Sequence, residues 1–499
     1  MTRIPNGKPM VQMQFDRIRP VRGGMALLLG AAVLQGCVLS NAVNDKDTKS
    51  QVSSWMRPDD AQDQLGAREH PIVLAKYGGE YRNAEVEKLL ALIVGRLVAV
   101  SDDKARTYKV TILNTPKINA FALPGGYLYI TRGLLALAND SSEIAAVIAH
   151  EMAHVSSQHS ILRREKERSV EVGNEVVSGV LDNSVAGRVA MAANQLKLAE
   201  FSKDQELQAD SIGIRMLGNA GFDPFAAARF LETMQAYQSM SSRGNDGLGD
   251  YSFMSSHPAT PRRVQLARQH ARFFGAPETV PAGRERYLAG IDGMLFGDSV
   301  EEGFVRGNRF AHAGLGITFS APQGAKMENQ STAVVVNGPG EIATRFDAAV
   351  LPRGQSLEKY LTSGWINGLE EGSIQSETLN GFPSASAKAT ADQWDFMIRV
   401  FQIGGDVYRF ITAAPAGDPA LEGASNAVTT SFRYLNDRER AELRPLTIHV
   451  VTVAEDDTLG KLSGRMKAGS NNLALFQVLN GLKPGEMPQP GTKVKIVTD

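Results

Sequence analysis

The most regular hydrophobic pattern in the chain predicts a buried helix that begins just after Asp140. Asp140 and Glu143 have the spacing of a capping box at a helix N-terminus. The residues that follow are mostly small and apolar: Ile144, Ala145, Val147, Ile148, Ala149, Ala153 and Val155. A weaker helical periodicity over residues 211–217 predicts another helix. We therefore expect the region 66–275 to form a mainly helical domain.

Strand patterns dominate the region 300–435. Residues 395–401 and 407–412 are rich in β-branched and aromatic residues and flank Gly404 and Gly405, which predicts a β-hairpin. Further strands and helices are expected at 316–319, 332–336, 356–365 and 420–432. The pattern predicts an α+β domain, and we find no catalytic group of residues in it.

The first 36 residues have the pattern of a secretion signal. Basic residues precede an apolar run, residues 25–34, that is too short to span a bilayer. Residues 34–37, Leu-Gln-Gly-Cys, resemble a bacterial lipobox. That resemblance implies cleavage before Cys37 and lipid attachment to it, with residues 37–65 as a polar tether. Because Val38 follows the cysteine, we expect an anchor on the periplasmic face of the outer membrane of a Gram-negative bacterium.

Length and composition narrow the possible classes of protein. A chain of 499 residues has room for about three domains. With 53 basic and 54 acidic residues, it has no positive excess that would suggest a nucleic-acid partner. Its single cysteine excludes a disulfide framework. No other apolar run approaches the length of a membrane span.

The chain's strongest chemical signal lies on the predicted helix after Asp140. His150, Glu151, Met152, Ala153 and His154 form the pattern H-E-x-x-H. Histidines four apart lie on one helix face, so both rings can reach the same Zn²⁺. The intervening glutamate is offset around the helix and is suited to act as a base beside the metal. The alternative is a pair of buried histidines with ordinary hydrogen-bond partners.

A catalytic zinc site needs a third protein ligand. The candidate is Glu206, and Asp210 lies four residues later on the same helix face. Asp210 could accept the ring N–H of a ligating histidine and fix its tautomer. On spacing alone, the favoured interpretation is that these acidic residues lie on a solvated helix face.

Four separated motifs resemble the HtpX-related gluzincin metallopeptidases, family M48, in their BepA/LoiP-like periplasmic type. These motifs are H-E-x-x-H at 150–154, E-x-x-A-D at 206–210, the segment 119–135 and the segment 256–263. They occur in the family's order over about residues 65–275. The resemblance implies a zincin-type domain at 66–275 that holds one Zn²⁺ per chain. It assigns the zinc ligands to His150, His154 and Glu206, and the general base to Glu151.

Two more sets of residues are candidates near the predicted site. His257 and Arg263 could stabilise the oxyanion of the reaction. His257 also follows the Gly- and Ser-rich loop 239–250, so it could occupy the open zinc position in a latent state. Asn119, Ala120 and Phe121 precede a predicted strand at 127–131, whose edge could bind an extended peptide. An ordinary hairpin corner is the alternative.

The C-terminal residues 445–499 resemble a LysM module, a small β-α-α-β glycan binder. A strand is expected at 448–453 and another at 493–496, with helical segments between them. The usual Gly-Asp-Thr turn of that family is Asp456-Asp457-Thr458 here, so a structural copy without glycan binding is an equal alternative. Together the patterns predict a multidomain α+β protein, in which the region 300–435 has a weak analogy to PsbP/Mog1-type folds.

These features predict a zinc-dependent endopeptidase of the cell envelope. The resemblance implies that it hydrolyses misfolded or stalled periplasmic and outer-membrane proteins, with zinc-activated water and Glu151 as general base. Two other classes stay open. One is an envelope scaffold or chaperone-like lipoprotein with a structural zinc, and the other is a peptidoglycan-binding lipoprotein.

Overall fold

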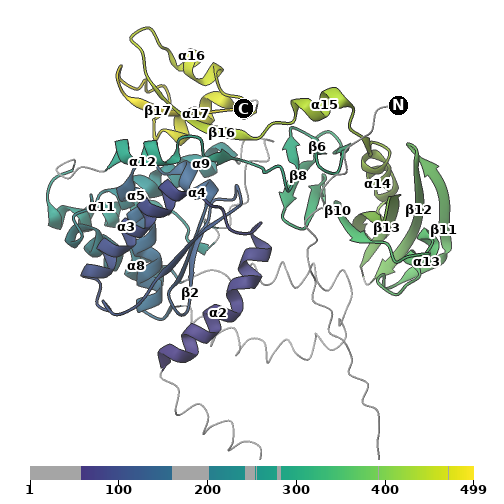
Figure 1. The fold of residues 1–499 in the computed structure, drawn as a ribbon, viewed down its shortest axis with the longest axis horizontal. Helices are drawn as coiled ribbons and strands as arrows, with labels where there is room; N and C mark the ends of the chain where they lie inside the picture. Colours follow the sequence, from purple (N-terminus) through teal and green to yellow (C-terminus); the bar gives the residue numbers. More distant parts are fainter. Residues whose placement is uncertain are drawn as a thin grey trace, which may run out of the picture. The chain divides into compact units, whose positions relative to one another are not determined.

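The computed structural model describes residues 58–159, 202–241, 253, 256–277, 283–391, 393–469 and 471–499. The chain divides into two units, Met1–Trp55 and Met56–Asp499, and every described residue lies in the second (Figure 1). The predicted signal peptide, lipidation residue Cys37, most of the tether and most of the loop 239–250 lie outside the described residues. Among the helices that are described, none is long and apolar enough to cross a membrane.

The N-terminal part of the described chain is mainly helical and contains one small sheet. Its helices are α2 (Pro58–Lys76), α3 (Ala84–Val100), α4 (Arg132–Leu137), α5 (Ser141–Ser156), α8 (Lys203–Asn219), α9 (Ala226–Ser241), α11 (Pro261–Ala271), the 3₁₀ helix η1 (Arg272–Phe274) and α12 (Arg284–Ile291). The strands β1 (Lys109–Leu113), β2 (Ala120–Leu123) and β3 (Tyr127–Thr131) lie in the order β1-β3-β2. Strand β2 is therefore an edge strand, antiparallel to β3.

Helix α5 is the buried helix that the hydrophobic pattern predicts. Asp140 is its N-cap and accepts a hydrogen bond from the backbone N–H of Glu143 at 2.8 Å. Every residue from Ser141 to His154 is buried. Helices α3 and α8 both pack against α5, as Figure 1 shows. A helix enclosed in this way places any polar side chain that it carries in the domain interior.

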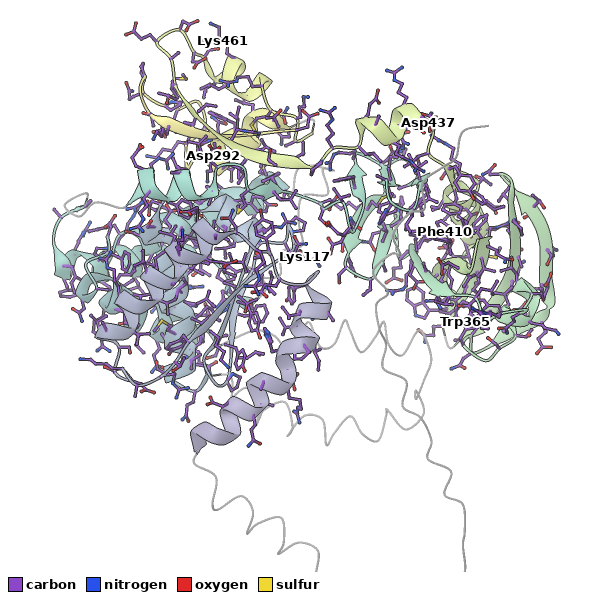
Figure 2. The ribbon with its side chains drawn as sticks, viewed as in Figure 1. Lys117, Asp292, Trp365, Phe410, Asp437 and Lys461 are labelled. Atoms are coloured by element: carbon purple, nitrogen blue, oxygen red, sulfur yellow. The ribbon has the colours of Figure 1, made fainter. Side chains whose placement is uncertain are left out.

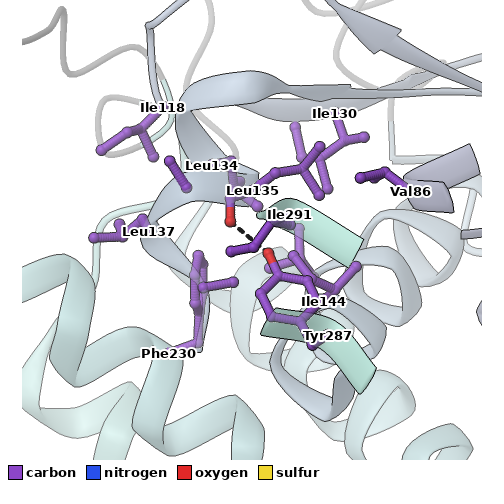
Figure 3. Close-up of a cluster of buried hydrophobic side chains, with 14 of the residues drawn as sticks. Val86, Ile118, Ile130, Leu134, Leu135, Leu137, Ile144, Phe230, Tyr287 and Ile291 are labelled. Atoms are coloured by element: carbon purple, nitrogen blue, oxygen red, sulfur yellow. Dashed lines mark hydrogen bonds between the residues drawn. The ribbon is translucent and has the colours of Figure 1, made fainter. Parts of the chain in front are cut away.

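A large apolar cluster surrounds the start of α5 and fixes its position (Figure 3). Ile144 packs there beside Tyr287 and Ile291 of α12 and Leu135 of α4. The Tyr287 hydroxyl donates a hydrogen bond to the Leu135 carbonyl, which satisfies both buried groups. Helices α4, α5 and α12 therefore pack together on the N-terminal side of the H-E-x-x-H residues.

The middle part of the chain has the mixture of strands and helices that the sequence pattern predicts. Its seven-stranded sheet has the order β11-β12-β13-β14-β10-β9-β8, and a four-stranded sheet has the order β15-β7-β6-β5. The bounds are β5 (Phe304–Arg306), β6 (Arg309–His312), β7 (Ile317–Ser320), β8 (Lys326–Gln330), β9 (Ala333–Asn337), β10 (Ala343–Val350), α13 (Leu357–Leu361), β11 (Leu369–Leu379), β12 (Phe382–Ala391), β13 (Trp394–Ile403), β14 (Asp406–Pro415), α14 (Leu421–Thr429) and β15 (Arg433–Tyr434). The predicted hairpin is confirmed, because β13 pairs with β14 across Gly404 and Gly405. Phe410 and Trp365, labelled in Figure 2, belong to separate apolar clusters of this domain.

The C-terminal part has the expected order of strand, two helices and strand. A short helix, α15 (Asp437–Glu442), precedes β16 (Leu446–Thr452), α16 (Leu459–Gly464), α17 (Asn472–Leu479) and β17 (Lys493–Thr498). Strand β16 also pairs with β4 (Leu295–Phe296), which follows helix α12. The small sheet β17-β16-β4 therefore includes a strand from outside residues 445–499.

Candidate metal centre

Helix α5 places His150 and His154 one turn apart on a buried face. Their side chains are almost completely shielded from solvent, and the two Nε2 atoms lie 3.0 Å apart. Rings separated by four residues meet in this way because side chains at i and i+4 project from the same side of a helix. Both Nε2 atoms are directed at one point in the domain interior.

Helix α8 brings Glu206 to the same point. Its Oε1 lies 3.3 Å from His154 Nε2, and its Oε2 lies 3.5 Å from His150 Nε2. The helix begins with a capping box formed by Ser202 and Gln205, which places Glu206 in the first turn. Glu206 is 2 % exposed, so it is not the solvated acidic residue of the alternative interpretation.

His257 completes a buried cluster of four groups. Its Nδ1 lies 2.9 Å from Glu206 Oε1 and 3.2 Å from His150 Nε2. One ligand atom from each of His150, His154, Glu206 and His257 lies within 4.8 Å of the other three. The Phe253 ring lies against His257, with ring centroids 4.7 Å apart, and the His257 backbone N–H donates to the Phe253 carbonyl. His257 is thus held in the cluster from two directions.

Asp210 and Arg263 lie behind these ligands. Asp210 Oδ1 is 3.0 Å from His150 Nδ1, the ring atom that faces away from the cluster. Arg263 donates to both oxygens of Asp210, at 2.7 and 2.8 Å, and its Nη1 lies 2.7 Å from Glu206 Oε2. A third donation goes to the Pro258 carbonyl. The guanidinium therefore bridges two carboxylates on successive turns of α8.

A further histidine, which sequence reasoning missed, lies behind His154. His159 is 2 % exposed, and its Nδ1 lies 3.0 Å from His154 Nδ1. Its Nε2 lies 3.3 Å from Gln208 Oε1 on α8. Burial lowers the pKa of His159. The available signal was a histidine five residues after the motif, but that spacing predicts no shared helix face.

The cluster has strongly coupled electrostatics. Burial lowers the pKa of His154 to about 2. Burial also opposes charge on His150, but hydrogen bonds with Asp210 and Glu206 outweigh it and raise the pKa of that ring to about 10. For Glu206, the reverse balance holds: burial acts to raise its pKa, but His257 and the surrounding ring N–H groups lower the pKa far below its usual range. His150 and Glu206 therefore stabilise each other's charged forms.

Glu151 lies beside the cluster without belonging to it. It is 3 % exposed, and its Oε1 has no hydrogen-bond partner among the described residues. The nearest ring atom is His257 Nε2, at 3.6 Å. Burial raises the pKa of Glu151, which makes the carboxylate a better proton acceptor.

The residues fit a zinc ion. Two imidazoles on one helix turn and a carboxylate from a second helix are a known catalytic donor set for Zn²⁺. A cation bound here would add to Arg263 and the histidines in compensating the buried charge of Glu206. Glu151, whose Oε1 has no hydrogen-bond partner among the described residues, lies beside the cluster, where such an ion would polarise a water molecule. His150, His154 and Glu206 would hold the ion, with His257 close enough to be a fourth ligand.

The candidate substrate residues lie at the start of the edge strand β2, which contacts α5. Asn119 and Ala120 are buried, and Phe121 is partly exposed. Asn119 donates to the Tyr77 hydroxyl at 3.3 Å, whereas its Oδ1 has no hydrogen-bond partner among the described residues. The turn after β2 requires glycine, since Gly126 has φ of 76° and a Cβ there would meet the Thr107 carbonyl.

Comparison with known proteins points to one peptidase family. Residues 81–271 match the model of Peptidase family M48. The mitochondrial metalloendopeptidase OMA1 of Schizosaccharomyces pombe is 30% identical over 174 residues, which are 35% of this chain and 49% of that protein. The β-barrel assembly-enhancing protease of Escherichia coli K12 is 29% identical over 203 residues, which are 39% of this chain and 40% of that protein. The chain spans about half the length, or less, of these curated relatives.

A solved structure matches a smaller part of the chain. The cyanobacterial PsbP protein CyanoP of Synechocystis sp. PCC 6803 covers 25% of this chain and 91% of its own length. The sequence identity is 12% and the TM-score is 0.21. The PsbP analogy for the region 300–435 stays a prediction.

Proposed function

We propose that this chain, which carries a peptidase domain of family M48, is a zinc-dependent endopeptidase. One observation carries the proposal above all others. The H-E-x-x-H helix and the distant Glu206 form one buried cluster with the ligand set of a catalytic zinc site. A purely structural zinc site has no need of the buried Glu151 carboxylate beside its ligands, with an Oε1 that has no hydrogen-bond partner among the described residues.

In this proposal, zinc held by His150, His154 and Glu206 would polarise a water molecule and the scissile carbonyl. Glu151 accepts the proton of the attacking water and passes it to the leaving amine. The raised pKa of Glu151 suits this transfer, because the carboxylate must hold the proton between the two steps. The buried walls of the site exclude bulk water, which strengthens every charge interaction.

The proposed role of Arg263 differs from the direct oxyanion contact that the sequence suggested. Arg263 is 5 % exposed, and its guanidinium contacts Asp210, Glu206 and the Pro258 carbonyl. We infer that Arg263 holds the two acidic residues in place, and that Asp210 in turn fixes the ring of His150.

We also propose that His257 is a removable fourth ligand in a latent state. Its Nδ1 lies within the cluster, where it would occupy the position that water needs. Replacement by alanine (His257→Ala) should leave zinc bound and change basal proteolysis several-fold. Unchanged proteolysis at full zinc content would remove this idea.

The edge of β2 is the proposed binding surface for an extended substrate. An edge strand offers backbone groups to a peptide, and β2 lies against the zinc-site helix α5. Asn119 lies at the start of this edge, with an Oδ1 that has no hydrogen-bond partner among the described residues, and Ala120 and Phe121 continue the strand. Asn119→Ala should raise the KM for a peptide substrate more than it lowers kcat; an unchanged KM would contradict this surface.

The proposed location is the cell envelope, with misfolded or stalled envelope proteins as substrates. Support comes from the lipobox-like sequence at Cys37 and from the E. coli relative, which is named a β-barrel assembly-enhancing protease. Cys37→Ala should move the protein from the membrane fraction to the soluble fraction. Persistent anchoring would contradict lipidation.

Binding of residues 445–499 to peptidoglycan stays a prediction, which pull-down with purified sacculi would test.

The decisive experiment compares the wild-type chain with Glu151→Gln. Both proteins should contain one zinc per chain and unfold at similar temperatures, because the substitution is close to isosteric. Only the wild type should cleave an unfolded substrate such as casein, with a loss of at least 1,000-fold in the variant, which is on the order of 4 kcal/mol of barrier height. Equal cleavage by both proteins would overturn the endopeptidase proposal, and a zinc-free wild type would overturn the metal site.

A further inference from the structure

A second histidine contact extends the proposed metal site beyond its ligands. Helix α5 ends at Ser156, and Gln158 then adopts the left-handed conformation, with φ of 55°. Residues other than glycine rarely take this conformation, because their Cβ approaches the backbone. The turn brings His159 back against the helix, where its ring is buried next to His154 with centroids 5.0 Å apart.

Hydrogen-bond chemistry fixes the direction of this contact. Gln208 Oε1 can only accept, so His159 Nε2, at 3.3 Å, carries a hydrogen. In a neutral ring the other nitrogen then has a lone pair, which makes His159 Nδ1 an acceptor. A zinc ion would take the lone pair of His154 Nε2, the atom that points into the cluster. His154 Nδ1 would then carry the hydrogen and donate it to His159 Nδ1, 3.0 Å away.

The other metal-ligand candidate on α5, His150, also has a partner at its Nδ1, but this partner is a carboxylate. His150 Nδ1 lies 3.0 Å from the Asp210 carboxylate, so in the neutral ring that a metal ligand requires, the lone pair of His150 would lie on Nε2. Each of the two rings on α5 is thus oriented through its Nδ1, one by a carboxylate and the other by an imidazole. Both sets of contacts lead to helix α8, because Asp210 holds His150 and Gln208 holds His159. Gln208 lies on α8 between Glu206 and Asp210.

We propose that His159, held by Gln208, is a positioning residue that fixes the tautomer and ring orientation of the metal ligand His154. This inference rests on the proposed zinc site and deepens it. It assigns a function to the strained turn at Gln158, which serves to return the His159 ring to the helix. Loss of the acceptor should let the His154 ring rotate and place N–H instead of a lone pair toward the metal.

The test uses the full chain and three variants. His159→Phe keeps a ring of similar size but removes the acceptor. His159→Gln supplies an amide oxygen that can accept the same hydrogen bond. His312→Phe is the matched control, because His312 lies on β6 outside the cluster. The measurements are the zinc dissociation constant by chelator competition, the visible spectrum of the Co²⁺-substituted protein, and the melting temperature without metal.

We expect His159→Phe to weaken zinc binding about 10- to 100-fold, the usual effect of losing a partner of a metal ligand. Its Co²⁺ bands should shift, whereas His159→Gln should recover most of the affinity and His312→Phe should match the wild type. Wild-type affinity in His159→Phe would overturn the proposal. The proposal would also be overturned if His159→Phe bound zinc more weakly and had a lower metal-free melting temperature, and if His159→Gln did not recover the zinc affinity. A wild type that binds no zinc would instead overturn the proposed function itself.

Discussion

At the scale of single residues, Arg263 is the charge on which the site depends most. It bridges Glu206 and Asp210 while only 5 % exposed. Arg263→Met would leave two buried carboxylates without their cation, and breaking such a pair costs about 3–5 kcal/mol. We predict a decrease of that size in the free energy of unfolding of the metal-free protein, measured by urea denaturation. Added zinc should restore part of it, because the ion compensates Glu206.

The neighbouring arginine provides the control for this prediction. Arg262 lies on the same first turn of α11 but is exposed to solvent. Arg262→Met should change the free energy of unfolding by less than about 0.5 kcal/mol, as is usual for surface positions. If Arg263→Met and Arg262→Met had the same free energy of unfolding, the contacts of Arg263 with Glu206 and Asp210 would not stabilise the fold. The orientation of Asp210 would then need another explanation.

At the scale of elements, the distance between α5 and α8 determines whether three ligands can share one ion. Gly213 sets this distance, because a Cβ there would lie 3.2 Å from the His150 backbone nitrogen. Gly213→Val should force the helices apart, destabilise the fold by about 1–3 kcal/mol and weaken zinc binding at least tenfold. Gly95→Val on α3 is the control, since nothing lies within 4 Å of a Cβ at Gly95. Equal zinc affinities would show that α8 tolerates the added side chain.

The same elements show what the sequence could predict about the site. His150 and His154 could be predicted because their spacing matches the period of a single helix. Glu206 could not be chosen from spacing, since its position depends on how α8 packs against α5. Only the resemblance to the metallopeptidase family distinguishes it from an acidic residue on a solvated helix face. His159 was missed for a similar reason: its place depends on a left-handed residue, Gln158, that no propensity predicts.

At the scale of the whole molecule, residues 445–499 share one apolar core with the zinc-site helices. Ile448, Phe476 and Val497 belong to the same buried cluster as Ile144 of α5. The order of strands and helices could be read from the sequence, but this shared core could not, because it depends on contacts between distant segments. The C-terminal part is therefore built into the peptidase fold, whatever its ability to bind glycan.

One buried lysine makes that integration testable. Lys495 on β17 is 0 % exposed, and its Nζ donates to the carbonyls of Ala136 and Ala138 at 2.8 and 2.7 Å, directly before the N-cap of α5. Lys495→Met keeps the length of the side chain but leaves these carbonyls without their donor, at about 1–3 kcal/mol each. We predict a lower melting temperature in a single transition and faster amide exchange in α5. Lys493→Met, on the same strand and partly exposed, should have little effect on either measurement. A transition in which residues 445–499 unfold separately, while α5 keeps its protection, would contradict a shared core and would favour an independent module.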